Sequence, residues 1–509
     1  MERKKFLGIE FGSTRIKAVC MDDGFAPISS GDYTWASTLI NGVWTYDLAE
    51  VWQGLKAALA PVEGRESLAA AGISGMMHGY LAFDKDWKLL TPFRTWQNTM
   101  TGQASEALTA LFGFNIPQRW SIAHLYQAVL NCEAHVESIA HITTLAGYVH
   151  YMLTGMNVVG IGEASGIFPI DSAAGDYDRE MMRKFNELPE IRALPWTLEQ
   201  LLPEVRLAGE AAGALTPHGA VLLDGLLKEG LPFAPPEGDA GTGMAATNSV
   251  APGSGNVSAG TSIFAMVVLD KMLSRVYPEI DMVTTPSGKP VAMVHCNNCT
   301  SDMNAWVGML GECAALFGAH PDAGELFTRL YQKSLEGAED CGGITVCNYQ
   351  AGEPVTGFDC GRPFVVREPS ATLCLADFLR AQLYSTLTTL SIGMELLREE
   401  QVEIARLMGH GGLFKTPVVG QAYLAAATGA PVCVMRTAGE GGPYGMAILA
   451  SYLVLGAGMT LEDYLDKRVF SRVEASELKP EEEAVEGFRR YLVRFKKALA
   501  IERAAIDSI

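Results

Sequence analysis

The stretch Phe6-Leu-Gly-Ile-Glu-Phe-Gly-Ser-Thr-Arg-Ile-Lys-Ala-Val-Cys-Met21 carries two largely apolar runs that flank a turn of small and hydroxyl-bearing residues. Two such runs separated by a Gly-containing turn predict a β-hairpin. The backbone N–H groups of the turn can approach an anion closely, because no bulky side chain shields them. Lys17 follows on the predicted second strand and can direct its charge toward the same anion.

A similar unit recurs about halfway along the chain. Residues 255–269 read Gly-Asn-Val-Ser-Ala-Gly-Thr-Ser-Ile-Phe-Ala-Met-Val-Val-Leu, with Gly260, Thr261 and Ser262 at the turn. Two similar hairpins, one opening each half, indicate an approximate internal repeat and therefore duplicated domains around a cleft. Short Gly/Ser/Thr turns are common, so two unrelated hairpins remain the alternative.

Helical patterns alternate with short apolar strands in both halves, which predicts an α/β fold. The small, polar segment at 247–256 is typical of a linker. We therefore expect one domain over residues 1–250 and a second over 251–509. The expected strands are 70–74 and 432–435, and the expected helices are 47–59, 124–136, 145–153, 371–400, 443–455 and 480–506.

Composition narrows the classes of partner. The 509 residues include 39 Lys and Arg against 58 Asp and Glu, a formal net charge of −19, which disfavours nucleic acid and anionic membrane surfaces. The opening residues lack the apolar core of a secretion signal, and the apolar stretch 446–459 is too short to span a bilayer. The sequence predicts a soluble, cytoplasmic protein with small-molecule partners, and a homodimer is compatible with it.

Ten cysteines are scattered along the chain, and only Cys296 and Cys299 form a C-x-x-C pair. A zinc site needs a further pair of ligands at similar spacing, although His295 offers a third donor. Reduced thiols in a reducing compartment are the favoured interpretation over a metal site.

The order of several segments resembles the FGGY carbohydrate kinases over nearly the whole chain. The resemblance implies two ribonuclease-H-like domains of the actin/hexokinase/Hsp70 superfold that flank a central cleft, with sugar mainly in the first and nucleotide mainly in the second. The segments are GIEFGSTRIKAV (8–19), GISGMMHGYLAFD (72–84), LTGMNVVGIGEASG (153–166), GDAGTGMA (238–245), SAGTSIFAM (258–266), NAW (304–306) and GHGGLFKTPVVGQAYLAAATGAPV (409–432).

Asp239 matches the family's catalytic aspartate, which implies that it accepts the proton of the attacking sugar hydroxyl. It precedes a helical run, so a helix cap is a second, compatible role, and the helix dipole favours its ionised form. Gly238 and Gly241 leave room for a ligand beside it. Glu10 stands where the family usually has the aspartate that holds Mg²⁺, so Glu10 and Asp239 are the metal candidates; a plain strand carboxylate is the alternative for Glu10.

The sugar-binding candidates lie in two segments. Met77, His78 and Gly79 match the family's Met-His-Gly sequence, which implies that His78 hydrogen-bonds a sugar hydroxyl. Trp96, Gln97 and Asn98 stand where the family commonly has Trp-x-Asp-x-Arg, so amides replace the carboxylate and the arginine is absent. Amides still donate to and accept from hydroxyls, but the change leaves the identity of the sugar open.

The ATP-binding candidates come from both hairpins and from the second half. The resemblance implies phosphate contacts from the first turn and its lysine and from the second turn, and adenosine contacts from paired glycines and two amides. The residues are Gly12, Ser13, Thr14, Lys17, Gly260, Thr261, Ser262, Asn304, Gly411, Gly412 and Gln421.

The sequence therefore predicts an ATP- and Mg²⁺-dependent kinase of a small sugar, with ketoses such as xylulose or ribulose ranked first. Three alternatives stay open: a polyol kinase, another ATPase of the same superfold, and a catalytically silent sensor that binds sugar and nucleotide. Retention of Asp239 and both hairpins argues against the sensor, which needs no base.

Overall fold

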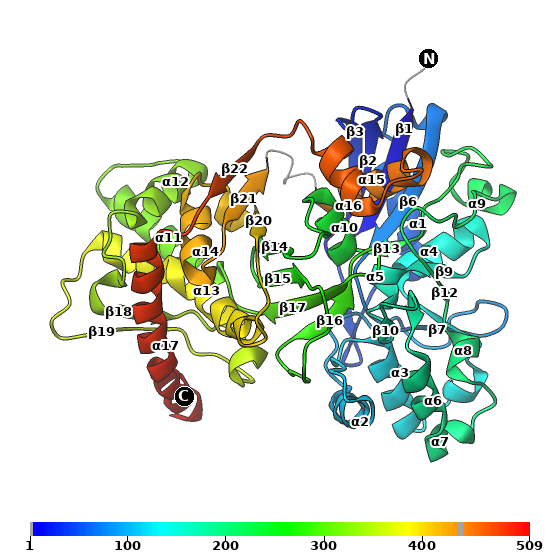
Figure 1. Ribbon diagram of the computed structural model, residues 1–509, viewed down its shortest axis with the longest axis horizontal. Coiled ribbons are helices and arrows are strands. Elements are labelled where there is room, and N and C mark those ends of the chain that lie inside the picture. Colours follow the sequence, from blue (N-terminus) through cyan, green and yellow to red (C-terminus); the bar gives the residue numbers. More distant parts are fainter. Residues whose placement is uncertain (1–3, 436–440, 509) are drawn as a thin grey trace.

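Two β-sheets organise the chain in the computed structural model, which describes residues 4–435 and 441–508 (Figure 1). The first sheet has five strands in the order β13-β6-β1-β2-β3, and the second has seven in the order β16-β17-β15-β14-β20-β21-β22. Each sheet is covered by helices, so the molecule has two lobes of mixed α/β structure, as expected. The strands of the first sheet are β1 (Lys5–Phe11), β2 (Arg15–Asp22), β3 (Pro27–Thr34), β6 (Leu68–Gly75) and β13 (Glu237–Gly238).

The first hairpin forms where the sequence predicts it. β1 and β2 pair antiparallel, with Glu10 opposite Lys17, and β1 also pairs parallel with β6. The strands are buried almost throughout because they lie in the centre of the sheet. Helix α1 (Leu48–Leu59), which begins after the capping side chain of Asp47, covers one face beside β3.

The other face of the first sheet is covered by a helix from far along the chain, α15 (Gly441–Leu455), which lies beside β1 and β2 in Figure 1. Contact is so close that a β-carbon on Gly8 would lie 1.9 Å from the carbonyl oxygen of Pro443. A division at residue 250 assigns α15 to the second domain, whereas its packing is with the first sheet. The chain then returns to the second sheet at β22 (Ala475–Leu478), which pairs with β21 (Val432–Met435).

The second hairpin also forms as expected, from β14 (Ser254–Ala259) and β15 (Ile263–Val268). The long helix α13 (Leu375–Glu399) is buried along most of its length, and α17 (Glu482–Ser508) closes this lobe. Tyr384 on α13 and Tyr491 on α17 meet edge to face in its core. The remaining second-sheet strands are β16 (Asp281–Thr284), β17 (Pro290–Cys296) and β20 (Arg406–Gly411).

A helical region with α2 (Gly102–Phe112) and α3 (Ser121–Leu130) lies below the first sheet in Figure 1, and α4 (Leu145–Thr154) packs against β6. The helix predicted at 124–136 is α3, which begins earlier and ends earlier. Its end is set by Cys132, whose backbone adopts the left-handed conformation (φ 51°) that an α-helix cannot continue.

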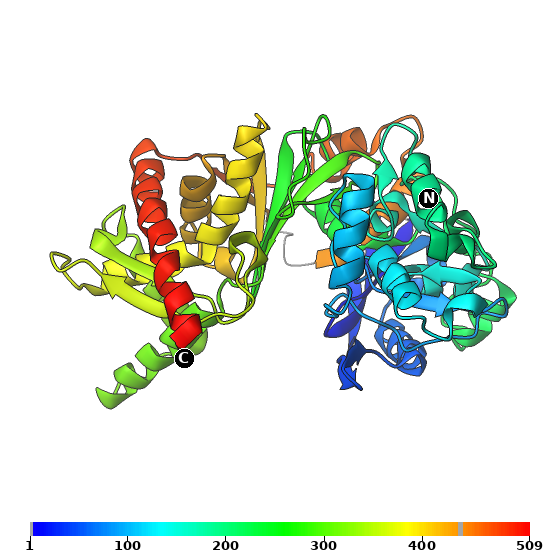
Figure 2. The ribbon, with the colours of Figure 1, turned by 90° about the horizontal axis from the view of Figure 1, so that it is seen from below.

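The two lobes touch at β16, which lies at their junction in Figure 1, and Figure 2 shows the green strands of the second sheet facing the first lobe. The Thr284 hydroxyl donates to the carbonyl of Ile161, on α5 (Ile161–Ala164), at 3.0 Å, and the Thr284 N–H donates to Ser165 Oγ at 3.1 Å. All ten cysteines are free thiols. Over the two described ranges, every helix is too short or too polar to cross a bilayer.

Candidate active site

Asp239 is the first residue of α10 (Asp239–Ala246), directly after β13. Gly238, rather than Asp239, is the N-cap residue. The Asp239 Oδ1 accepts hydrogen bonds from the N–H of Ala240 at 2.9 Å and of Met77 at 3.2 Å. Asp239 keeps contact with solvent, but protein atoms surround most of its carboxyl group. The resulting desolvation raises the pKa of Asp239, while the two N–H donors lower it.

Glu10, on β1, lies near Asp239. The pKa of Glu10 is raised to about 7, chiefly by burial and also by the charge of Asp239, while Lys17 on β2 opposes both effects. The two carboxyl groups are therefore electrostatic neighbours, as two magnesium-binding oxygens must be. Within the described parts of the chain no cluster of three His, Cys, Asp or Glu side chains could hold a metal, so a magnesium ion here would take its other ligands from water and phosphate.

The first turn is braced from behind by two aromatic side chains. Trp35 Nε1 donates to the Gly12 carbonyl at 2.7 Å, and the Tyr46 hydroxyl donates to the Ser13 carbonyl at 2.7 Å. Ser13 and Thr14 stay exposed at the tip. These braces were not anticipated from the sequence, because nothing local to Trp35 or Tyr46 links them to turn residues that lie 23 and 33 positions earlier.

The second turn is fixed to the start of α11 (Ser301–Leu316). The Gly260 carbonyl accepts from the Thr300 N–H at 3.1 Å and from its hydroxyl at 2.7 Å. A β-carbon on Gly260 would meet no atom within 4 Å, and Thr261 is exposed. The tip of this hairpin is therefore accessible, as a phosphate contact must be.

A cavity of about 370 Å³ adjoins the second turn. It brings together Asn304 and Gly412, which are separated by more than a hundred residues. Gly411 beside it adopts φ 98°, and a β-carbon there would lie 2.4 Å from the Ala259 carbonyl oxygen of β14. The lining residues are Thr300, Asn304, Gly324, Phe327, Thr328, Tyr331, Gly412, Lys415 and Thr416.

Gln421 does not line this cavity. Its amide nitrogen donates to the carbonyl of Ser476 at 2.9 Å and of Val432 at 3.2 Å, and its oxygen accepts from the Ser476 hydroxyl. The buried side chain on α14 (Val419–Thr428) thus joins the helix to β21 and β22. The Gln421 amide therefore hydrogen-bonds within the fold instead of facing the nucleotide cavity.

The segment that carries His78 lies just after β6. His78 and Gly79 both have positive φ, 71° and 91°, so the backbone turns sharply there. His78 Nδ1 lies 3.3 Å from the Gly166 carbonyl, and its ring stacks on Trp120. Burial, followed by the charge of Arg119, lowers the pKa of His78 well below its usual range. The ring is neutral, and because a carbonyl only accepts, Nδ1 carries the proton and Nε2 is the acceptor.

In the second predicted sugar segment, Trp96 is exposed, whereas Asn98 has a structural role. Trp96 is 38% exposed. The Asn98 side chain is buried; its Nδ2 donates to the carbonyls of Trp44 and Thr95, and its Oδ1 accepts from the Trp44 N–H at 2.9 Å. Asn98 therefore holds the segment in place, and Trp96 and Gln97 are left as the candidate contacts.

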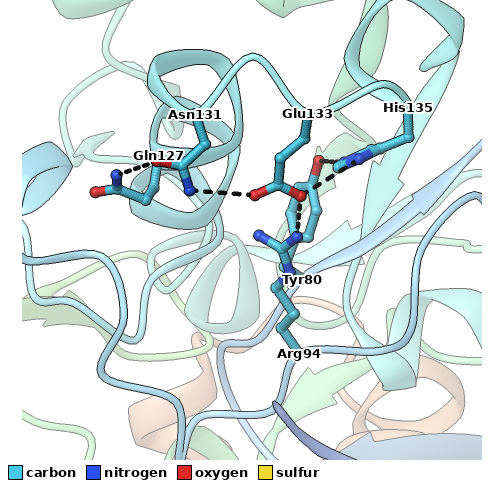
Figure 3. Close-up of polar contacts among 6 residues, drawn as sticks. All are labelled: Tyr80, Arg94, Gln127, Asn131, Glu133 and His135. Atoms are coloured by element: carbon cyan, nitrogen blue, oxygen red, sulfur yellow. Dashed lines mark hydrogen bonds and ion pairs between the residues drawn. The ribbon is translucent and has the colours of Figure 1, made fainter. Parts of the chain in front are cut away.

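A buried polar network supports both sugar segments (Figure 3). Tyr80, two residues after His78, and Arg94, two residues before Trp96, exchange backbone hydrogen bonds of 2.8 and 3.2 Å. The Arg94 guanidinium lies over the Tyr80 ring and forms an ion pair with Glu133. The Tyr80 hydroxyl meets His135 Nε2 at 2.9 Å, and His135 Nδ1 lies 3.6 Å from Glu133. This network was not foreseen, because its members come from three separate segments.

Two further carboxyl groups lie buried behind Asp239. Burial raises the pKa of Glu237 to about 8 and that of Glu163 well above its usual range. A β-carbon on Gly238 would lie 2.6 Å from Glu163 Oε2, and one on Gly241 would lie 3.1 Å from Glu237 Cγ. The bare backbone at Gly238 and Gly241 therefore accommodates these two side chains, whereas the sequence suggested room for a ligand.

Known proteins resemble the chain over most of its length. It is 23% identical over 468 residues to the xylulose kinase of Haemophilus influenzae, covering 88% of this chain and 90% of that protein. Its fold matches the crystal structure of gluconate kinase from Lactobacillus acidophilus with a TM-score of 0.79, at 15% identity and 98% coverage of both chains. It matches xylulose kinase from Rhodospirillum rubrum with a TM-score of 0.77, at 19% identity, covering 98% of this chain and 99% of that one.

Family models match both halves of the chain. Residues 5–244 match the N-terminal domain of the FGGY family of carbohydrate kinases, and residues 255–454 match its C-terminal domain. Together these ranges include both hairpins, Asp239 and the cavity beside the second turn. The chain belongs to the FGGY family of carbohydrate kinases.

Proposed function

We propose that this carbohydrate kinase transfers the γ-phosphoryl group of ATP to a hydroxyl of a ketose, with xylulose- or ribulose-like pentuloses as the first choice. The hydrogen bond from the Met77 N–H to Asp239 Oδ1 carries the proposal. It joins the candidate base to the candidate sugar segment, 162 positions apart in the sequence. The relatives of this chain include xylulose kinases, which agrees with a ketose.

Asp239 would accept the proton of the attacking hydroxyl. Its desolvation favours this role, because a carboxylate with a raised pKa is a stronger proton acceptor. The two N–H donors hold one oxygen in place and leave the other for the hydroxyl. His78 Nε2 would accept a hydrogen bond from a second hydroxyl and so orient the sugar for in-line attack.

ATP would bind with its phosphates between the two turns and its adenosine in the cavity lined by Asn304 and Gly412. Ser13, Thr14 and Lys17 would contact phosphate from the first lobe, and Thr261 and Ser262 from the second. Glu10 and Asp239 would hold the phosphate-bound Mg²⁺, which supplies positive charge against the charge that develops on the transferred group.

An ADP-release assay with ATP, Mg²⁺ and a panel of ketoses, polyols and aldonates tests the reaction. We expect turnover with a pentulose, and Asp239→Asn should lower kcat by at least about a hundredfold while nucleotide binding stays largely intact. Asp23→Asn, in an exposed turn, is the matched control and should behave like wild type.

Two results would contradict the proposal. Normal turnover by Asp239→Asn would show that Asp239 is not the base. Sugar binding without ADP release by the wild type would identify a sensor. A preference for glycerol or another polyol would show that the acceptor is not a ketose, and the reaction class would stay the same.

Since the reaction consumes ATP and small sugars, we also propose that the protein works in the cytoplasm. It would be a monomer or a homodimer, which light scattering would distinguish.

A further inference from the structure

Helix α11 has one face that is partly open to solvent and follows the spacing of a helix-pairing seam. The residues of this face recur alternately four and three positions apart, so they lie in a row along one side of the helix. We call this row the α11 seam; it consists of Asp302, Trp306, Met309, Cys313 and Leu316. Asn304, which lines the nucleotide cavity, lies on the other side of the helix by its spacing. The α11 seam is therefore separate from the proposed active site.

The C-terminal end of the α11 seam is an apolar projection. Leu316 is 83% exposed, and Phe317, directly after it, is 89% exposed. Among the large apolar side chains of the described residues, these two are the most exposed. Met309 in the middle of the seam is 44% exposed, and Cys313 is an exposed free thiol. Neighbouring exposed apolar side chains of this kind mark a contact surface.

The N-terminal end of the α11 seam lines a hollow of about 470 Å³ between the helix and β19 (Phe364–Arg367). Its one charged lining residue is Asp302, whose carboxylate accepts a hydrogen bond from Trp306 Nε1 at 3.1 Å. The other lining residues are Ala305, Met309, Pro363, Phe364 and Val365. Hollows of this size accept a drug-sized molecule, so an inserted apolar side chain fits. One helix thus carries both an apolar projection and an apolar hollow.

Two copies of α11 that run antiparallel bring each projection to the hollow of the other copy. With the two-fold axis beside Gly311, each residue faces the residue that lies equally far from Gly311 on the second copy. Leu316 then faces Trp306 of the second copy, and Cys313 faces its Met309. The same surface serves both copies, as a two-fold homodimer requires.

The distribution of charge favours the same pairing. The molecule carries a formal net charge of −19, so two copies repel each other over much of their surfaces. Of the 16 residues of α11, only Asp302 and Glu312 are charged. In the antiparallel pairing, Asp302 lies beside the exposed His320 of the second copy, just beyond the helix end, and the two helix dipoles oppose each other. The α11 seam is therefore a surface where self-association meets little repulsion.

We propose that α11 and β19 form a two-fold interface through which two copies of this chain associate. A standard interface buries about 800 Å² per partner, which is more than one helix face supplies. Val365 and Val366 of β19, 41% and 37% exposed, extend the apolar surface beside the seam. The dimer is accordingly of modest affinity, and its population depends on the protein concentration.

Sedimentation equilibrium of the full chain over a wide range of concentrations measures the association. We expect the wild type to dimerise at high concentration. Phe317→Glu should raise the dimer dissociation constant at least about tenfold, because a carboxylate would enter the apolar hollow. Val221→Glu is the matched control: Val221 is 74% exposed on α9 (Pro217–Leu222) in the first lobe, so the dissociation constant should equal that of the wild type. Both variants change exposed side chains and should fold like the wild type, which circular dichroism checks.

A disulfide tests the register of the pairing. Met309→Cys places a thiol opposite Cys313 of the second copy, so mild oxidation with diamide should give a covalent dimer, and a further Cys313→Ser change should abolish it. A wild type that is monomeric at every concentration would overturn the inference, and so would a dimer that Phe317→Glu leaves intact. Loss of association in Phe317→Glu without a cross-link in Met309→Cys would overturn the antiparallel pairing. These measurements involve neither sugar nor ATP, so their outcome is independent of the proposed kinase function.

Discussion

Glu10 Oε1 fills the space that a β-carbon on Gly442 would occupy, at a separation of only 1.9 Å. The carboxyl group of a β1 residue is thus pressed against the first turn of α15, more than four hundred residues later in the chain. Thr242 Oγ1 of α10, at 3.1 Å from the same point, closes the other side. The candidate metal ligand, the helix that carries Asp239 and α15 are therefore packed as one unit.

Gly442→Ala should disrupt the packing of Glu10 and α10 against α15. The added methyl group cannot be accommodated without moving α15 or Glu10, and overpacking of this kind costs about 1–3 kcal/mol in the free energy of unfolding. We expect a lower Tm and a reduced kcat at saturating ATP. Gly308→Ala on α11 is the control: its β-carbon would enter open space, so it should leave kcat unchanged and stabilise slightly. Equal behaviour of the two variants would refute the packing argument.

His78→Ala should weaken binding of the sugar and leave ATP untouched. The neutral ring presents Nε2 as an acceptor, one residue after Met77, whose N–H donates to Asp239, and its removal deletes one hydrogen bond to the acceptor hydroxyls. We expect the acceptor KM to rise about tenfold and the ATP KM to stay within twofold. His218→Ala, on an exposed helix start, should match the wild type. A selective rise in the ATP KM would disprove the assignment.

Glu237 makes stability depend on pH. Its folded-state pKa of about 8 exceeds the unfolded value near 4.5, so the folded protein binds the extra proton between these values. The resulting stabilisation is fully present below about pH 4.5 and is lost as the pH rises through about 8. We expect Glu237→Gln to have a Tm that falls less between pH 5 and pH 8.5 than that of the wild type. Parallel Tm curves would show that Glu237 ionises normally.

The sequence predicted those features that depend on local pattern. Both hairpins follow from apolar runs around small turns, and the helix start at Asp239 follows from its glycine-rich approach. The packing of α15 on the first sheet could not be predicted in this way. A buried helix that is apolar on all sides has no sequence pattern that indicates which sheet it covers.

Roles of polar side chains were the least predictable part of the site. Asn98 and Gln421 stand in segments that resemble binding motifs, yet their amides bond to backbone groups of neighbouring strands and turns. Gly238 likewise reads as space for a ligand and instead makes space for Glu163. Each of these outcomes depends on a partner distant in sequence, which motif spacing does not encode.

Gln421→Ala should consequently lower stability rather than nucleotide affinity. It leaves the buried carbonyl of Val432 without its amide donor, at a cost of about 1–3 kcal/mol, and also removes the donor to the Ser476 carbonyl on the exposed strand β22. Chemical denaturation measures this loss, and calorimetry with ADP on the folded variant should return the wild-type Kd. Asn304→Ala, which removes a residue lining the cavity, is the contrasting variant and should weaken ADP with little change in stability. The opposite pattern would restore Gln421 to the nucleotide site.

Glu133→Gln should disturb the sugar site from a distance. Arg94, with a side chain only 7% exposed, would lose its counter-charge, and breaking a buried pair costs about 3–5 kcal/mol; the 26% exposure of Glu133 places the expected loss at the lower end. Because Arg94 and Tyr80 join the two sugar segments, the acceptor KM should rise while the ATP KM does not. Glu180→Gln breaks an exposed pair with Arg183 and should change neither stability nor KM measurably. If Glu133→Gln lost stability but kept its acceptor KM, the network would support the fold alone and the sugar segments would be positioned by other contacts.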